Sequence, residues 1–145
     1  MSPPVAKKPV VPAAPLRIAI VDDSRSQRDG WAILLGSQTD FAVVGQAGDG
    51  AQALALARRE QLDVLLMDIQ MPRVNGLVAA ERIRGDARVR ELGKVPRIVL
   101  VTALDLDDYV PAAAVAGAYA VIYKDIEPEA LFEILREAAA YRGDA

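Results

Sequence analysis

Short apolar runs alternate with segments of mixed polarity along most of the chain. Four runs are plain, LRIAIV (16–21), FAVVGQA (41–47), DVLLM (63–67) and RIVLV (97–101), and a fifth lies near residues 118–123. Short runs that are apolar on both faces are typical of strands buried in a parallel sheet with helices on both sides. The pattern therefore predicts an α/β fold with five strands.

The intervening segments show the three- and four-residue spacing of amphipathic helices. After the first run, Gln27, Trp31 and Leu34 share one helical face, and Ser24 is placed to cap that helix. Further helices are expected after the GDG at 48–50, around 77–84, near 107–116 and from Pro128 onward, because proline is favoured at a first helical position. The charged stretch 86–94 is expected to be a loop.

Strands and helices in strict alternation limit the topology to few choices. Right-handed crossovers favour a flavodoxin-like, doubly wound (βα)5 fold, with a five-stranded parallel sheet in the order 2-1-3-4-5. The folded domain is expected to cover residues 16–142. Residues 1–15 hold five of the nine prolines, so this segment is predicted to be a disordered tail.

Composition removes several classes of chemistry. The chain has neither cysteine nor histidine, which excludes disulfides, thiolate nucleophiles, serine–histidine triads and the usual zinc sites. A net charge of −3 gives no general attraction to nucleic acid, so we expect no direct nucleic-acid binding by this domain. No apolar stretch has the length of a membrane span, and a cytoplasmic location is the expectation.

Reactive side chains stand where the predicted strands end. Asp22 and Asp23 follow the first run, Asp68 the third, Thr102 the fourth and Lys124 the fifth. Because parallel strands place their carboxyl ends at one edge of the sheet, these residues are expected to lie together.

Such a cluster would combine like charges with two groups that bind phosphate. Two carboxylates about 4 Å apart repel by about 4 kcal/mol at an effective dielectric of 20. A Mg²⁺ ion among oxygen ligands relieves that repulsion. A carboxylate beside Mg²⁺, a lysine and a hydroxyl can then accept a phosphoryl group.

Each residue also has an ordinary structural interpretation. Asp22 and Asp23 could cap a helix, and Asp68 could be a turn residue. Thr102 suits any strand, and a single Lys124 is usually a surface charge. Their convergence at the ends of four strands favours a site.

Four motifs carry a family resemblance. VDDS (21–24), MDIQMPRVNG (67–76), VTA (101–103) and YKD (123–125) resemble the signature of response-regulator receiver domains in two-component signalling. The resemblance implies a phosphoacceptor that is not a conventional turnover enzyme. Its donor would be a phosphohistidine on a sensor histidine kinase or a phosphotransfer protein.

The resemblance also assigns roles to single residues. Asp68 would be the phosphoacceptor, Asp23 a direct Mg²⁺ ligand and Asp22 a ligand mostly through water. The backbone carbonyl of Gln70 would also bind the metal. Thr102 and Lys124 would contact the phosphoryl group.

Three positions depart from the usual family pattern. Val121 stands where receivers usually have an aromatic switch residue, although Tyr119 and Tyr123 are two positions away on either side. Asp125 follows the lysine in place of a cis-proline, which is typical of the LuxR-like transcription-factor subfamily. Leu104 is apolar at a position that tunes dephosphorylation, which predicts a long-lived phosphate.

The output surface is expected to combine the fourth helix, which contains Pro111, with the fifth strand and the last helix. Phosphorylation would shift that surface toward a homodimer or a partner-bound state. Two alternatives remain: a docking module that is never phosphorylated, and a phosphatase of the haloacid-dehalogenase type. The second needs a DxD pattern on the first strand, where this chain has adjacent Asp22 and Asp23.

Overall fold

The structure is a computed structural model that describes residues 14–141. Its strands and helices alternate, except that β3 and β4 are each followed by two helical elements. In chain order the elements are β1 (Leu16–Val21), α1 (Arg25–Gly36), β2 (Phe41–Ala47), α2 (Gly50–Arg59), β3 (Val64–Asp68), α3 (Gly76–Gly85), α4 (Ala87–Glu91), β4 (Arg97–Thr102), the 3₁₀ turn η1 (Leu106–Asp108), α5 (Val110–Val115), β5 (Ala120–Tyr123) and α6 (Pro128–Ala140).

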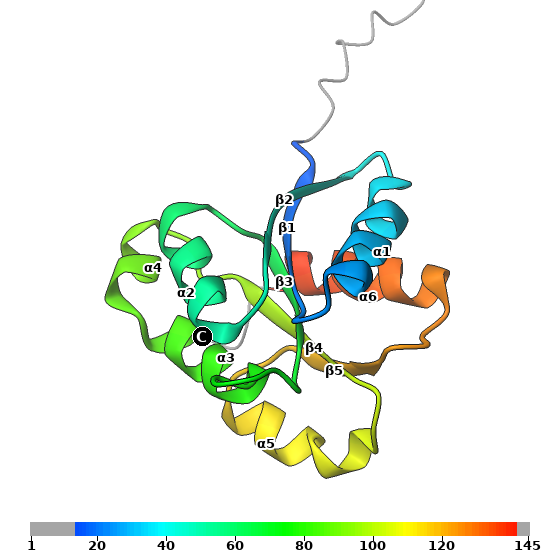
Figure 1. The fold of residues 1–145 in the computed structure, drawn as a ribbon. Coiled ribbons are helices and arrows are strands. Elements are labelled where there is room, and N and C mark those ends of the chain that lie inside the picture. Colours follow the sequence, from blue (N-terminus) through cyan, green and yellow to red (C-terminus); the bar gives the residue numbers. More distant parts are fainter. Residues whose placement is uncertain (1–13, 142–145) are drawn as a thin grey trace, which may run out of the picture.

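The sheet has the predicted topology. Its five strands are parallel and lie in the order β2-β1-β3-β4-β5. Helices α1 and α6 cover one face, and α2 to α5 cover the other (Figure 1). The prediction of a doubly wound, flavodoxin-like sheet is therefore confirmed.

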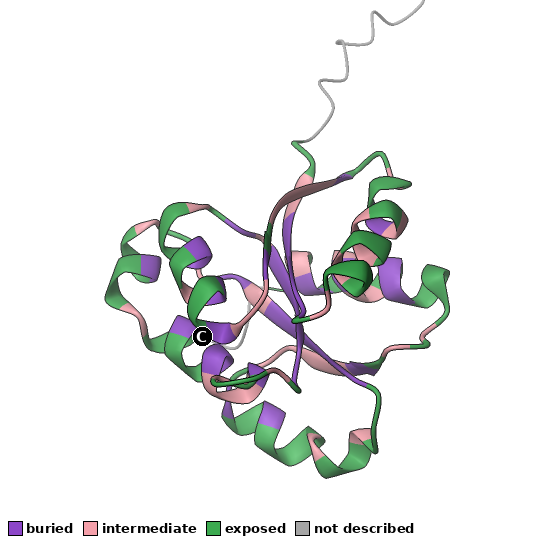
Figure 2. Cartoon of the chain, in the orientation of Figure 1, coloured by how far each residue is buried: buried purple, intermediate pink, exposed green. Residues whose placement is uncertain are grey.

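Burial follows this layered arrangement. The central strands are almost entirely buried, and every residue of β3 is buried (Figure 2). Ile18 and Ile20 on one side of β1 pack toward α1 and α6, whereas Ala19 and Val21 face α2 and α3. Alternate residues of one strand therefore supply two separate cores, which is why the strands are apolar throughout.

Short polar side chains fix where four of the helices begin. Ser24, Asp49, Asn75 and Asp86 each accept a hydrogen bond from the backbone amide three residues further along. These N-caps satisfy amides that have no partner inside the helix. The prediction that Ser24 caps the first helix is confirmed.

Two local predictions were wrong. The stretch 86–94, expected as a loop, contains α4, because Asp86 caps it and Val89 is buried against the core. The helix expected near 107–116 is divided into η1 and the shorter α5. Pro111 lies in the first turn of α5, where a missing amide donor costs little.

The end of α6 is attached to the start of β4. The Arg97 guanidinium donates two hydrogen bonds, of 3.1 and 2.9 Å, to the Tyr141 carbonyl and lies 5.3 Å from the centroid of its ring. The Tyr141 ring also contacts Tyr119 edge to face, at 5.4 Å between centroids. The last described residue is therefore held where the strands begin.

Two further points concern the extent of the chain. The tail predicted for residues 1–15 falls almost wholly on residues 1–13, which lie outside the described part, as does residue 142 of the predicted domain. Within residues 14–141, no helix combines the length and the apolar character needed to cross a bilayer.

Candidate functional site

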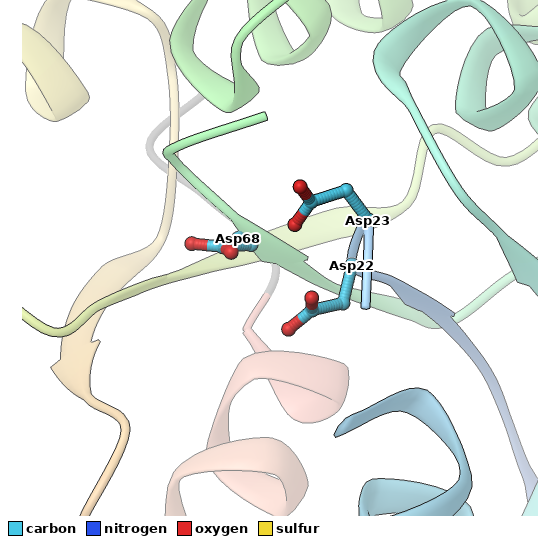
Figure 3. Close-up of side chains that lie close together, drawn as sticks. All are labelled: Asp22, Asp23 and Asp68. Atoms are coloured by element: carbon cyan, nitrogen blue, oxygen red, sulfur yellow. The ribbon is translucent and has the colours of Figure 1, made fainter. Parts of the chain in front are cut away.

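Three aspartates meet at the carboxyl ends of β1 and β3. These strands are neighbours in register, with Val21 opposite Met67, so the residues that follow lie side by side. Asp22, Asp23 and Asp68 each offer a carboxylate oxygen within 4.8 Å of those of the other two, and Figure 3 shows their side chains directed to the same side. Asp22 and Asp68 are only 1% and 3% exposed, whereas Asp23 is exposed.

Local hydrogen bonds orient the two buried carboxylates. Asp22 Oδ1 accepts the Ser24 amide at 2.9 Å, and Asp68 Oδ1 accepts the Gln70 amide at 3.2 Å. Each carboxylate thus bonds the backbone two residues ahead, as aspartate commonly does at the start of a turn. The short segments that end β1 and β3 therefore also orient the carboxylates of Asp22 and Asp68.

The turn between β3 and α3 requires glycine at position 76. The Gly76 amide donates to the Ile69 carbonyl at 2.8 Å, which brings the start of α3 against the end of β3. A Cβ atom at this position would lie 2.4 Å from the Asp68 carbonyl oxygen and 2.9 Å from Ile69 Cα. Because both neighbours are backbone atoms, a side chain here would displace the segment that carries Asp68.

Lys124 and Thr102 complete the edge, as predicted. Lys124 Nζ lies 3.2 Å from Asp68 Oδ2 and 3.9 Å from Asp22 Oδ2. Thr102 follows Val101, the β4 partner of Asp68, and is fully buried. Its hydroxyl accepts the Leu104 amide at 3.1 Å.

The electrostatics favour binding of a cation. Burial raises the pKa of Asp68, opposed by its hydrogen bond from Lys124, and the charge of Asp23 raises it further. Burial also raises the pKa of Asp22, to which the charge of Asp68 adds. An all-oxygen cluster with one exposed member suits Mg²⁺, which prefers carboxylates and retained water.

Sequence reasoning missed three polar contacts at this edge. The Lys124 ammonium donates to Gln27 Oε1 at 2.9 Å, the side-chain amide of Gln70 donates through Nε2 to the Tyr109 hydroxyl at 3.3 Å, and the Tyr123 hydroxyl accepts the Leu106 backbone amide at 3.3 Å. A glutamine at the start of an otherwise apolar helix face was the one available signal. The two tyrosine contacts join segments whose pairing no local pattern reveals.

The unusual positions lie close to these contacts. Val121 is half-buried and packs in the core on the α2-to-α5 side of the sheet. The place of the usual aromatic ring is thus taken by a smaller aliphatic side chain. Tyr123 is 44% exposed and Leu104 is 53% exposed. The predicted effect of Leu104 on phosphate lifetime stays a prediction.

Comparison with known proteins identifies the family. The sequence profile of the response regulator receiver domain matches residues 18–136. The chain belongs to this family. The chain is similar to the uncharacterized transcriptional regulatory protein YxjL of Bacillus subtilis, with 39% identity over 132 residues that cover 90% of this chain and 56% of YxjL. It thus spans about half the length of such curated relatives.

Solved receiver domains have the same fold. The signal receiver domain of the putative response regulator NarL from Mycobacterium tuberculosis matches with a TM-score of 0.78 and 29% identity, covering 90% of this chain and all of that one. The receiver domain of the sensor histidine kinase PA1611 from Pseudomonas aeruginosa matches with a TM-score of 0.74 and 26% identity, over 88% of this chain and 100% of that one. That structure has a magnesium ion coordinated in its active-site cleft.

Proposed function

We propose that this receiver domain accepts a phosphoryl group on Asp68, in a Mg²⁺-dependent reaction, from a phosphohistidine of a sensor histidine kinase or phosphotransfer protein. One observation carries the proposal: Lys124 lies 3.2 Å from a buried Asp68 that shares its edge of the sheet with two further carboxylates. A buried carboxylate with only a structural role would be balanced by the lysine alone, so the two further carboxylates favour a metal-binding site.

The residues of the site divide the reaction among them. One Asp68 oxygen attacks phosphorus, a P–O bond forms and the P–N bond of the donor breaks. The electron pair leaves on the imidazole nitrogen, which takes a proton from solvent. Lys124 neutralises charge on the transferred oxygens. The Thr102 hydroxyl accepts the Leu104 amide, and its own hydrogen donates to one of the phosphoryl oxygens.

Asp22, Asp23 and the Gln70 carbonyl would hold Mg²⁺, together with Asp68. When bound, the ion neutralises negative charge on the transferring phosphoryl group. The magnesium in the PA1611 receiver supports this assignment, because that domain has the same fold.

The phosphorylated state would be transmitted through α5, β5 and α6. The loop after Thr102 leads directly into η1 and α5, and the Tyr123 hydroxyl on β5 accepts the amide of Leu106, the first residue of η1. The Gln70–Tyr109 bond provides a second link, from the metal-binding segment to the start of α5. Through these two contacts a change at the site could reach α5 and β5 without an aromatic ring at position 121. The expected outcome is a homodimer or a partner complex formed through the surface of α5, β5 and α6.

The decisive experiment is labelling by a small phosphate donor. With acetyl phosphate and Mg²⁺, the wild-type domain should gain one phosphoryl group by intact-protein mass spectrometry. Asp68→Asn should gain none, and EDTA should suppress labelling. Asp29→Asn on the exposed side of α1 is the matched control and should label like the wild type. Equal labelling of Asp68→Asn would overturn the assignment.

A docking module that is never phosphorylated is the second candidate, favoured by the absence of the usual ring at Val121. It predicts no labelling by acetyl phosphate or by any phosphohistidine donor, while partner binding persists. Turnover of a small phosphate ester would instead favour a phosphatase. We place the domain in the cytoplasm, where it would act without binding nucleic acid itself.

A further inference from the structure

Lys124 is held by a residue from the opposite side of the site. Its Nζ donates to Gln27 Oε1 at 2.9 Å, closer than the 3.2 Å to Asp68 Oδ2. Gln27 comes from α1, whereas Lys124 follows β5, so the contact spans 97 residues of sequence. A lysine side chain is flexible and its ammonium can turn freely, so its placement at a reacting group has to come from such contacts.

Gln27 can reach Lys124 because the backbone amide that a glutamine in its position usually bonds is already bonded to Asp22. A glutamine in the third position of a helix commonly bonds back to a backbone amide at the N-terminus. Gln52, in that position of α2, accepts the amide of Gly48, the residue before the N-cap Asp49, at 2.8 Å. In α1 the amide of the N-cap itself, Ser24, which is the usual partner of such a side chain, is already bonded to Asp22 Oδ1. The Gln27 side chain therefore extends to Lys124.

The chemistry of the amide suits this role. A neutral oxygen takes one ammonium hydrogen without cancelling the positive charge, whereas a carboxylate would compete with Asp68 and with an incoming phosphate. With one hydrogen directed to Gln27, the others remain for Asp68 Oδ2 and for a phosphoryl oxygen. The lysine is oriented and keeps its full charge.

We propose that Gln27 is a positioning residue for phosphoryl transfer, which orients the Lys124 ammonium toward Asp68. This inference rests on the proposed function of Asp68. It adds a residue that touches neither the metal-binding carboxylates nor the reacting atoms.

Gln27→Met is a suitable test variant. Gln27 is exposed and lines an open cavity of about 320 Å³ with Gly30, Trp31, Leu34 and Lys124, so a methionine fits without displacing neighbours. The change removes the acceptor oxygen and leaves the length of the side chain nearly unchanged. Gln52→Met is the matched control, because it removes a glutamine acceptor from the same position of α2.

The first measurement is the labelling rate at saturating acetyl phosphate and Mg²⁺. Gln27→Met should slow it by roughly 3- to 10-fold, the range expected for one hydrogen bond, with little change in the half-saturating donor concentration. Gln27→Glu should slow it further, because its charge holds the lysine away from the phosphoryl group. Gln52→Met should label at the wild-type rate.

The second measurement is a double-mutant cycle with Lys124→Met. Gln27→Met should have no further effect in that background, because its action depends on the lysine. An equal loss in both backgrounds, or a wild-type rate for Gln27→Met, overturns the proposal.

A third measurement does not depend on phosphorylation. NMR relaxation of the Lys124 side-chain methylenes in the metal-free domain should show greater mobility in Gln27→Met than in the wild type. Unchanged mobility overturns the proposal. If the wild type takes no label at all, the proposed function fails, whereas the NMR result still decides whether Gln27 orients Lys124.

Discussion

Aspartates at the two ends of the same sheet are in opposite electrostatic situations. Asp40, just before β2, bonds Arg136, and this hydrogen bond holds its pKa below the usual range. Asp63, just before β3, pairs with Lys94. At the other end Asp22 and Asp68 are buried beside each other, share Lys124 and have raised pKa values.

The difference separates stability from reactivity. A carboxyl group whose pKa is lowered by folding stabilises the folded state at neutral pH, and one whose pKa is raised opposes folding there. At the end of the sheet where the strands begin, the aspartates are therefore paired with basic side chains. The end where the strands finish retains an unfavourable electrostatic energy that a bound cation would relieve.

Mg²⁺ binding should give the largest effect. At about 100 times its Kd, Mg²⁺ should raise the free energy of unfolding by about 2.7 kcal/mol, because only the folded state assembles the three carboxylates. Denaturant unfolding with Mg²⁺ and with EDTA measures this difference. Asp23→Asn should lose most of it, whereas Asp63→Asn should retain it. A gain of the same size in both variants would contradict the metal assignment.

Two glycines at opposite ends of α3 provide a matched steric test. Gly76→Ala should cost about 1–3 kcal/mol, as overpacked sites do, because its Cβ meets backbone atoms of Asp68 and Ile69. A Cβ at Gly85 meets nothing within 4 Å, so Gly85→Ala should be neutral or stabilise by up to about 1 kcal/mol. Denaturant unfolding compares the two, and equal costs would mean that the close approach at Gly76 is not rigid.

Removing the charge of Asp68 should stabilise the metal-free domain. In EDTA at neutral pH, Asp68→Asn should gain on the order of 1 kcal/mol, because burial of the carboxylate and its repulsion by Asp23 together exceed its attraction to Lys124. The sign follows from the raised pKa: the wild type recovers this cost as the pH falls through the folded pKa toward the ordinary value of about 3.9. The advantage of the variant should therefore shrink as the pH falls. An advantage that does not change with pH would indicate a packing effect instead.

Asp40→Asn should give the smallest effect, with the opposite sign. The pair with Arg136 is about half exposed, so its loss should lower the melting temperature only slightly at pH 7. Because the pKa of Asp40 is lowered, its contribution is present above the ordinary value and disappears as the pH falls through the folded pKa. The wild type and the variant should therefore converge in acid. Thermal unfolding from pH 7 to pH 3 tests this, and a difference that grows in acid would contradict it.

Much of the fold and of the site could be predicted because both depend on short-range patterns joined by topology rules. Apolar runs located the strands, and parallel connection placed Asp68 and Lys124 at one edge. The pattern around 86–94 did not reveal α4, because Val89 is its only buried residue among charged neighbours. The contacts of Gln27 and Tyr109 were not predicted, because their partners are distant in sequence and a polar side chain gives no sign of which distant group it will bond.

The attachment of Tyr141 to Arg97 determines the direction in which a signal must travel. Arg97 opens β4, and the β4 partner of Asp68 is Val101, four residues further along the strand, or roughly 13 Å. Tyr141 therefore lies near the opposite pole of the domain from Asp68. If Asp68 accepts the proposed phosphoryl group, a response at Tyr141 would travel along the length of β4, from Val101 to Arg97.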